Sequence, residues 1–281
     1  MGFLADCGQT LDYFESQPLI KYIKKHGIIQ FLLLYKKFKD SCQSQVFWGD
    51  EIEFHLLSID PKAKSAKLQI NTDYLFNTLK PDDFNLQPEF GSWMIETVPN
   101  NPYKFDGNPL VVLKNMELRR AKVQEMCNEG DVLFAGTAFP LLGVGDYFVP
   151  RIENGPQKTL PPKKEDDCLE MTIDYKRLNP FSHSQFVHDE IISCHPRFPT
   201  SVENVRQRRG EKVKILAPIY QDENTLREAT KDEPYPGFIY MDALHFGMGS
   251  GCLQVTFGTE NVEEARYLTD QLAVLSSIMV K

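Results

Sequence analysis

The sequence predicts a protein of the α+β class, because some segments repeat apolar residues with a helical period and others alternate apolar and polar residues. The helical segments cover residues 17–40, 108–127 and 261–280, and the extended ones cover 45–59, 67–70, 132–138, 212–220 and 251–258. With 42% hydrophobic and 25% charged residues, a chain of 281 residues can bury a sizeable core.

The first helix, over residues 17–40, is predicted by apolar side chains that recur every three or four positions. A glycine in its middle, Gly27, predicts a bend or an interruption. The strand over 45–59 follows from strict alternation of side chains, and an Asp-Pro pair ends it with turn chemistry. Residues 67–70 then fit the return strand of a hairpin.

The central helix, over 108–127, is followed by an Asn-Glu-Gly triplet, which makes Gly130 the expected C-cap. A short strand over 132–138 comes next. Residues 143–180 are rich in proline, glycine and charge, which predicts a long surface loop. The last helix, over 261–280, begins with an asparagine beside two glutamates, as suits a helix N-terminus.

Charge and cysteine content exclude several classes of protein. The net charge of −8 offers no basic excess, which argues against a nucleic-acid partner. Six widely spaced cysteines without a Cys-x-x-Cys pair predict reduced thiols and a cytoplasmic location. The longest apolar run, over 28–35, is too short to span a bilayer, so no membrane association is expected.

Two acidic side chains share one face of the predicted strand over 45–59. Side chains alternate across a strand, so Glu51, Glu53 and His55 point to one side while Ile52 and Phe54 point to the other. Carboxylates spaced in this way lie roughly 7 Å apart. In a cavity their repulsion is costly unless a cation such as Mg²⁺ lies between them. A solvated strand face remains the alternative, and for an isolated pair the more common one.

A second acidic pair, Glu89 and Glu96, lies in a segment rich in glycine and proline. On one straight strand two residues seven apart face opposite sides. The flanking prolines and the Gly91-Ser92 pair argue against a helix. A turn at Gly91 and Ser92 would bring both carboxylates to one site.

Two further segments are candidates for ligand binding. The glycine-rich stretch 247–251 allows close backbone approach to a ligand, and Cys252 and Gln254 follow on one face of a predicted strand. The basic cluster 206–209 could receive phosphate or carboxylate groups. A flexible turn and a solvated basic patch are the respective alternatives.

Several long segments resemble the catalytic subunits of eukaryotic glutamate–cysteine ligases, and together they span nearly the whole chain. They include Trp48–Glu53, Pro88–Glu96, Arg208–Val213, Ile239–Ala243, Phe246–Gly249 and Cys252–Phe257. The match is poor from Gly145 to Phe186. Ser250 and Gly251 stand where relatives often carry Asn-Cys.

The resemblance implies a glutamine-synthetase-like fold, in which an antiparallel sheet surrounded by helices forms a funnel-shaped active site. Family subunits are longer, so residues 1–281 would form the N-terminal portion of a single catalytic domain. The implied reaction is ATP-dependent ligation of the glutamate γ-carboxyl to cysteine through a γ-glutamyl phosphate, the first step of glutathione biosynthesis. It also implies Mg²⁺, ATP as co-substrate and a modifier subunit as a possible partner.

Residue by residue, the resemblance implies a metal site and a substrate site. The implied magnesium ligands are Glu51, Glu53, Glu89, Glu96 and Gln254, with Glu53 and Glu96 also assigned catalytic roles. The implied substrate-binding residues are Met248, Gly249, Cys252 and Gln254. Two rivals stay open: a truncated, non-catalytic family member that binds a partner or reflects an incomplete gene model, and a carboxylate-rich metal-binding protein without ligase chemistry.

Overall fold

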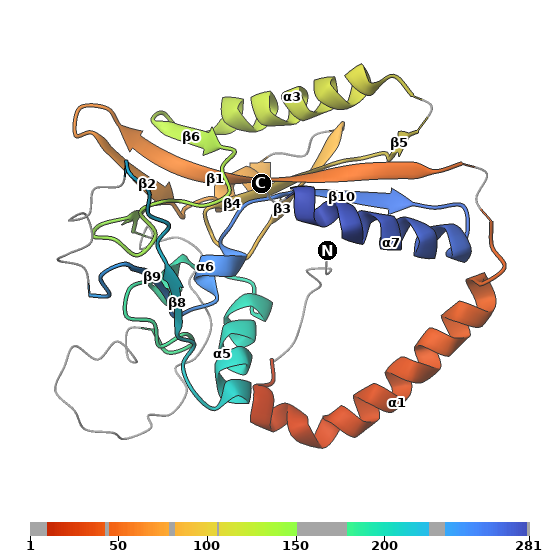
Figure 1. The fold of residues 1–281 in the computed structure, drawn as a ribbon. Coiled ribbons are helices and arrows are strands. Elements are labelled where there is room, and N and C mark those ends of the chain that lie inside the picture. Colours follow the sequence, from red (N-terminus) through yellow and green to blue (C-terminus); the bar gives the residue numbers. More distant parts are fainter. Residues whose placement is uncertain are drawn as a thin grey trace.

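The computed structural model describes residues 10–42, 45–78, 82–105, 107–150, 179–224 and 234–279. Helices and strands are mixed along the chain, as the sequence predicts (Figure 1). In order, the elements are α1 (Tyr13–Phe38), β1 (Phe47–Asp60), β2 (Ser65–Gln69), α2 (Asp73–Thr78), β3 (Phe84–Pro88), β4 (Met94–Pro99), β5 (Tyr103–Lys104), α3 (Pro109–Met126), β6 (Asp131–Phe134), β7 (Phe148–Val149), the 3-10 helix η1 (Asp189–Ile191), α5 (Arg197–Arg209), β8 (Ile215–Pro218), β9 (Phe238–Met241), α6 (His245–Met248), β10 (Leu253–Gly258) and α7 (Val262–Met279).

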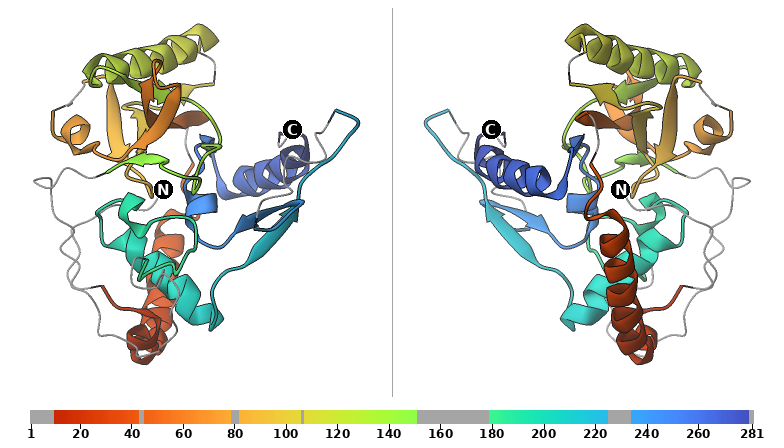
Figure 2. Two further views of the ribbon diagram at one scale, coloured as in Figure 1. Left: turned by 90° about the vertical axis from the view of Figure 1, so that its left-hand side faces the viewer. Right: turned by 90° about the vertical axis from the view of Figure 1, so that its right-hand side faces the viewer.

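The long strand β1 is the centre of a curled, eight-stranded sheet. It pairs antiparallel with β10 and β6 along one edge and with β5, β4 and β2 along the other. Among the described residues of this sheet, the parallel pair is β2 and β7. Ile52 is paired on both edges of β1, with Thr97 of β4 on one side and Leu253 of β10 on the other. A separate two-stranded sheet, β8–β9, projects with α7 to one side of the main sheet (Figure 2).

The two faces of β1 are buried against different partners. On one face, Phe54 and Leu56 pack with Val123 of α3 in a fully buried cluster. On the other face, Leu57 packs with Trp93 and other buried residues of the facing loops. The predicted alternation of β1 is therefore confirmed, and Glu51 and Glu53 belong to the face that points away from α3.

A buried ion pair ties α3 to the sheet. Arg119 of α3 and Asp50 of β1 form a salt bridge, and both side chains are completely buried. The same guanidinium donates a hydrogen bond of 2.8 Å to the backbone oxygen of Thr97 on β4. Asp50 and Thr97 are the sequence neighbours of Glu51 and Glu96, so one arginine fixes β1 and β4 where both carry a site carboxylate.

Several predicted boundaries need correction. Helix α1 runs through Gly27 without interruption. Cys127, not Gly130, caps α3, whereas Gly130 adopts a left-handed φ of 86° in the turn before β6. The loop predicted over 143–180 contains β7 near its start, and its part over 151–178 lies outside the described residues. The helices α2, α5 and α6 were not predicted; α2 and α6 have only six and four residues, which is too short for a repeating apolar pattern, and α5 is polar over most of its length.

None of the helices within the described ranges has the length and apolar character needed to cross a bilayer.

Candidate functional site

Strand pairing brings acidic residues from distant segments onto one face of the sheet. Glu53 of β1 lies directly opposite Glu96 of β4, and Glu51 lies directly opposite Gln254 of β10. Directly opposed residues in an antiparallel pair project to the same side of the sheet. These four predicted site residues therefore share the face of β1 that points away from α3.

Glu53 is held by two hydrogen bonds from the β10 segment. The side-chain amide of Gln254 donates to Oε1 of Glu53 over 2.8 Å, and the backbone N–H of Cys252 donates to Oε2 over 3.1 Å. Glu53 is almost fully buried, with 7% of its surface exposed. Both carboxylate oxygens thus have a fixed orientation, as a ligand or positioning group requires.

Glu96 has the most deeply buried carboxyl group of the site. Its side chain is fully buried, and neither carboxylate oxygen accepts a hydrogen bond from an N–H group of the described residues, so its neighbour is another carboxyl group, that of Glu89. Burial, a hydrogen bond shared with the neighbouring carboxyl group of Glu89, and the charges of Glu89, Glu51 and Glu53 together raise the pKa of Glu96 to about 8. At neutral pH the carboxyl group of Glu96 therefore retains its proton unless a cation binds beside it.

The β3–β4 hairpin places Glu89 beside Glu96. The turn predicted around Gly91 and Ser92 is present: the N–H of Met94 donates to the Gly91 oxygen over 2.9 Å. The hydroxyl of Ser92 donates to the Ile192 oxygen over 2.9 Å, which anchors the turn to the segment after η1. The two glutamates thus reach one site although they are seven residues apart.

The donor set fits a hard cation. Carboxylate and amide oxygens are the ligands that Mg²⁺ prefers, and both oxygens of Glu96 and one oxygen of Glu51 are buried and accept no hydrogen bond from an N–H group of the described residues. No three His, Cys, Asp or Glu side chains in the described ranges already converge at metal-binding distance. Bringing Glu51, Glu53, Glu89 and Glu96 around an ion therefore requires rotation of glutamate side chains on a preformed sheet.

The glycine-rich stretch after α6 is shaped by protein packing. A Cβ at Gly249 would overlap the backbone oxygen of His245 and lie 2.9 Å from the Trp93 ring. A Cβ at Gly251 would lie 2.9 Å from Nε2 of His55. Burial lowers the pKa of His55 to about 4, so this imidazole is neutral. Because these two positions are glycines, the loop can pack closely against the buried rings of Trp93 and His55. Cys252, whose N–H bonds Glu53, follows directly.

Replacing Gly249 by alanine should therefore lower the free energy of unfolding by about 1–3 kcal/mol, the usual cost of overpacking. Gly247 is the matched control, because a Cβ there meets nothing within 4 Å. Urea unfolding of both variants checks this expectation. Equal stabilities of the two variants would show that the loop can accommodate a Cβ at position 249, contrary to the close contacts in the structure.

The basic cluster over 206–209 lies at the C-terminal end of helix α5. Arg206 and its neighbours form the last turn of α5, which Gly210 closes with a left-handed φ of 76°. Cations at a helix C-terminus stabilise the helix dipole. Nearby, Lys212 donates a hydrogen bond of 3.0 Å to the fully buried Asp242, which also accepts from Ser184 over 2.5 Å. The position of the arginines at the end of α5 and the contacts of Lys212 support a structural role for this basic segment.

Comparison with known proteins assigns the family. The family described as Glutamate-cysteine ligase matches residues 2–281. The chain belongs to the glutamate–cysteine ligase family. It is similar to the glutamate–cysteine ligase catalytic subunit of Homo sapiens, with 36% identity over all of this chain and 44% of the relative. The glutamate–cysteine ligases of Candida albicans and Saccharomyces cerevisiae match the whole chain at 35% and 33% identity, over 41% and 43% of their lengths. The chain thus spans less than half the length of these relatives.

In this member of the glutamate–cysteine ligase family, two of the predicted substrate residues, Cys252 and Gln254, contact Glu53. Met248 ends α6 and is 46% exposed, and Gly249 is buried against Trp93. Burial and the neighbouring Glu53 raise the pKa of the Cys252 thiol to about 11, so it stays protonated at neutral pH. Cys252 acts on Glu53 through its backbone N–H, which no side-chain pattern could have predicted.

Sequence reasoning missed two residues that support the site. Arg119 lies on a helix whose apolar pattern is weak, and nothing local marks it as buried. Trp93 lies inside the segment Pro88–Glu96, and it is fully buried between His55 and Gly249. A large aromatic residue between two glutamates was the available signal for the second of these.

Proposed function

We propose that this chain carries the carboxylate half of a glutamate–cysteine ligase active site. The observation that carries the proposal is the pairing of Glu53 with Glu96, whose fully buried carboxyl group lies beside Glu89 and accepts no hydrogen bond from an N–H group of the described residues. Family membership adds the ligase activity for which the relatives are named. Residues 1–281 would form the N-terminal portion of one glutamine-synthetase-like catalytic domain in the cytoplasm.

The proposed reaction is phosphorylation of the glutamate γ-carboxylate by ATP, followed by attack of the cysteine amine on the acyl phosphate. Bound Mg²⁺ would neutralise phosphate charge and align ATP with the carboxylate. The chain's own residues provide the oxygen ligands, Glu51, Glu53, Glu89, Glu96 and Gln254. Gln254 and the Cys252 N–H orient Glu53, and Met248 and Gly249 line the substrate side.

A rival proposal is a non-catalytic family member that binds a partner, such as a modifier subunit. The human, rat and mouse relatives are named catalytic subunits. A subunit implies an assembly with another chain, and this favours a partner. This rival keeps the carboxylate site but predicts no turnover by the chain alone.

One assay with the purified chain separates the proposals. Phosphate release from ATP with Mg²⁺ should require both glutamate and cysteine, and Glu53→Gln should reduce it by at least about 100-fold because both ligand geometry and charge change. The matched control is Glu125→Gln, an exposed residue of α3. Nucleotide-dependent Mn²⁺ binding without turnover would favour the non-catalytic rival. If neither occurs in a folded protein, the carboxylate site is not a nucleotide–metal site.

A further inference from the structure

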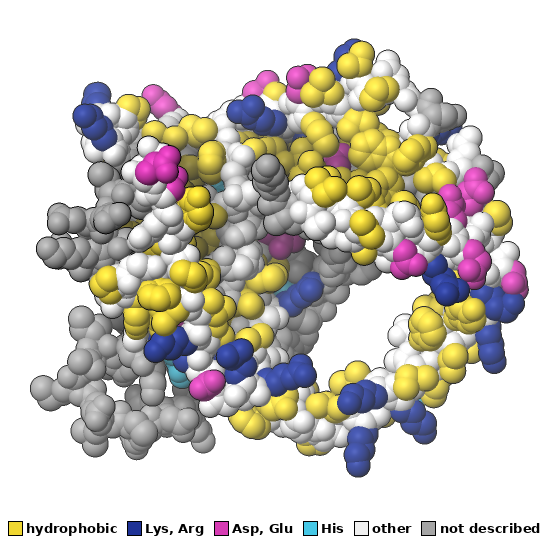
Figure 3. Space-filling model, in the orientation of Figure 1, with side chains coloured by type: hydrophobic (Ala, Val, Ile, Leu, Met, Phe, Trp, Pro, Cys, Tyr) yellow, Lys and Arg dark blue, Asp and Glu magenta, His cyan; other side chains and the backbone are white. Residues whose placement is uncertain are grey.

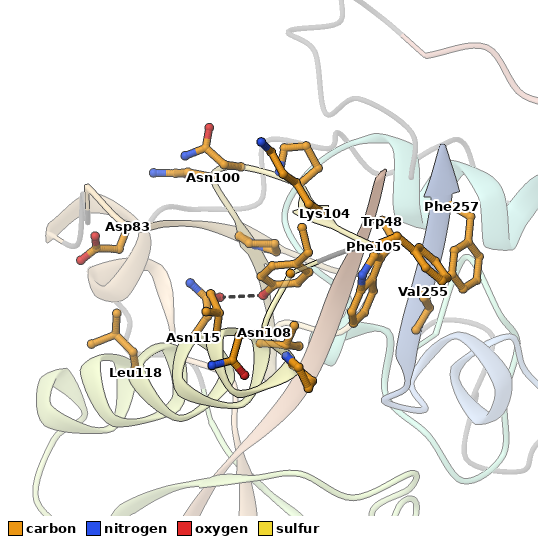
Figure 4. A pocket seen from close by; sticks show the side chains of 18 of the residues that line it. Trp48, Asp83, Asn100, Lys104, Phe105, Asn108, Asn115, Leu118, Val255 and Phe257 are labelled. Carbon is orange, nitrogen blue, oxygen red and sulfur yellow. Dashed lines mark hydrogen bonds between the residues drawn. The ribbon is translucent and has the colours of Figure 1, made fainter. Parts of the chain in front are cut away.

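A large cavity lies on the opposite face of the main sheet from the glutamates. Its volume is about 750 Å³, and its walls come from the first half of α3, β5 and the loop after it, β1 and β10 (Figure 4). A second hollow of about 540 Å³ lies between β10 and α7 and shares Phe105 and Phe257 with the first. The two hollows therefore adjoin at Phe105 and Phe257, and together they are here called the aromatic groove, which extends from α3 to α7.

Aromatic rings form the middle of the aromatic groove. Trp48 and Tyr103 have ring centroids 5.0 Å apart, and those of Phe105 and Phe257 are 6.3 Å apart. Trp48, Phe105 and Phe257 lie side by side around the opening (Figure 4). Phe105 is 66% exposed, and Figure 3 shows hydrophobic side chains gathered on this face between α3 and α7. Aromatic rings in such an exposed hollow are typical anchors of protein interfaces.

Acidic side chains mark both ends of the aromatic groove. Asp82 and Asp83 line the end beside β3, and Glu260 and Glu264 line the end beside α7. Lys104 is the single cationic side chain along the described walls. An occupant that is apolar in its middle and basic at its ends complements this distribution of charge.

The remaining polar groups of the walls suit a polypeptide. Four asparagines line the larger hollow: Asn100, Asn101, Asn108 and Asn115. A side-chain amide offers donors and an acceptor, as does a peptide backbone. Asn100 already donates to the Asp82 oxygen and Asn108 already accepts from the Leu110 N–H, so each retains only part of this capacity. The hydroxyl of Tyr103 donates to Oδ1 of Asn115 over 3.0 Å, which leaves the amide N–H groups of Asn115 directed away from that bond.

We propose that the aromatic groove binds a short protein segment with aromatic or aliphatic anchors in its middle and lysine or arginine at both ends. The anchors fill the space between Trp48, Phe105 and Phe257. The basic ends meet the aspartates at one end of the groove and the glutamates at the other. This binding is independent of the proposed ligase chemistry, because the groove and the carboxylates lie on opposite faces of the sheet.

The test uses the full chain and a short fluorescein-labelled peptide with Leu-Phe-Leu at its centre and a pair of lysines at each end. Its anisotropy should rise on binding, and affinity should fall with added salt. A peptide with glutamates in place of the lysines should bind about tenfold more weakly at low salt. Trp48 supplies a second signal, since Trp93 is buried on the other face.

Matched variants show whether the peptide occupies the groove. Phe105→Ser should weaken binding about tenfold, whereas Tyr220→Ser should not, because Tyr220 is 84% exposed and lies outside the groove. Replacing Asp82 and Asp83 together by asparagine should remove much of the salt dependence. Equal binding of the two peptides, or binding unaffected by Phe105→Ser, overturns the proposal. Self-association of the chain that Phe105→Ser abolishes also overturns it, in favour of a second copy as occupant.

Discussion

Arg119→Met will lower the free energy of unfolding by about 3–5 kcal/mol, the cost of removing one partner from a buried ion pair. The substitution preserves much of the volume of the side chain but leaves the fully buried Asp50 without its salt bridge. It also removes the hydrogen bond to the Thr97 oxygen. Because both contacts lie next to site carboxylates, cation binding should weaken along with stability.

Urea unfolding monitored by circular dichroism measures the effect. Arg120→Met is the matched control, because Arg120 is the exposed neighbour on the same helix, and it should change stability by less than about 0.5 kcal/mol. Adding Asp50→Leu to Arg119→Met should restore part of the lost stability, since the uncompensated charge is then gone. If Arg119→Met alone were as stable as the wild type, water would have to reach Asp50.

Glu96→Gln should have the second-largest effect, and its sign depends on pH and on cations. The folded-state pKa of Glu96, about 8, lies above its ordinary value of 4.5. The folded protein therefore holds a proton that the unfolded chain releases, and stability falls as pH rises from about 4.5 to 8. Each unit of pKa difference corresponds to about 1.4 kcal/mol. Without divalent cations, Glu96→Gln should therefore be more stable than the wild type at pH 8 but not at pH 4.

Urea titrations at pH 4, 6 and 8 with a chelator present give the stability profile, with Glu125→Gln as the control for an exposed carboxylate. A parallel Mn²⁺ titration should show weaker binding to Glu96→Gln at every pH, because an amide replaces an anionic ligand. An unchanged pH profile would contradict the burial of a lone carboxyl group at this position. Unchanged Mn²⁺ affinity would remove Glu96 from the metal site.

Local periodicity accounts for the elements that were predicted correctly. The strand that carries Glu51 and Glu53 shows alternation over many residues, and the structure extends it over Phe47–Asp60. The helix over Pro109–Met126 was also expected, although its apolar face is poorly marked. Helix α5 was missed because its buried apolar residues, Phe198, Pro199 and Val202, occupy only its first half, and no apolar residue repeats with them through its arginine-rich second half except Val205. In its place, the sequence suggested only a basic patch.

The candidate site required tertiary information for a similar reason. Nothing local distinguishes Glu53, which is buried and bonded, from an exposed glutamate such as Glu125. Gln254 lies 201 residues from Glu53 along the chain, and the hydrogen bond between them exists only because β10 pairs with β1 in one register.

The sequence by itself determined which residues share a strand face and that carboxylates would line the face of β1 that carries Glu51 and Glu53, because side-chain direction follows from the backbone period. Only the tertiary structure decided that Glu96 lies opposite Glu53 and is fully buried, and that Arg119 supports both strands from behind. Strand register and burial arise from contacts between distant segments. The pKa of a carboxyl group follows from those contacts, not from its place in the sequence.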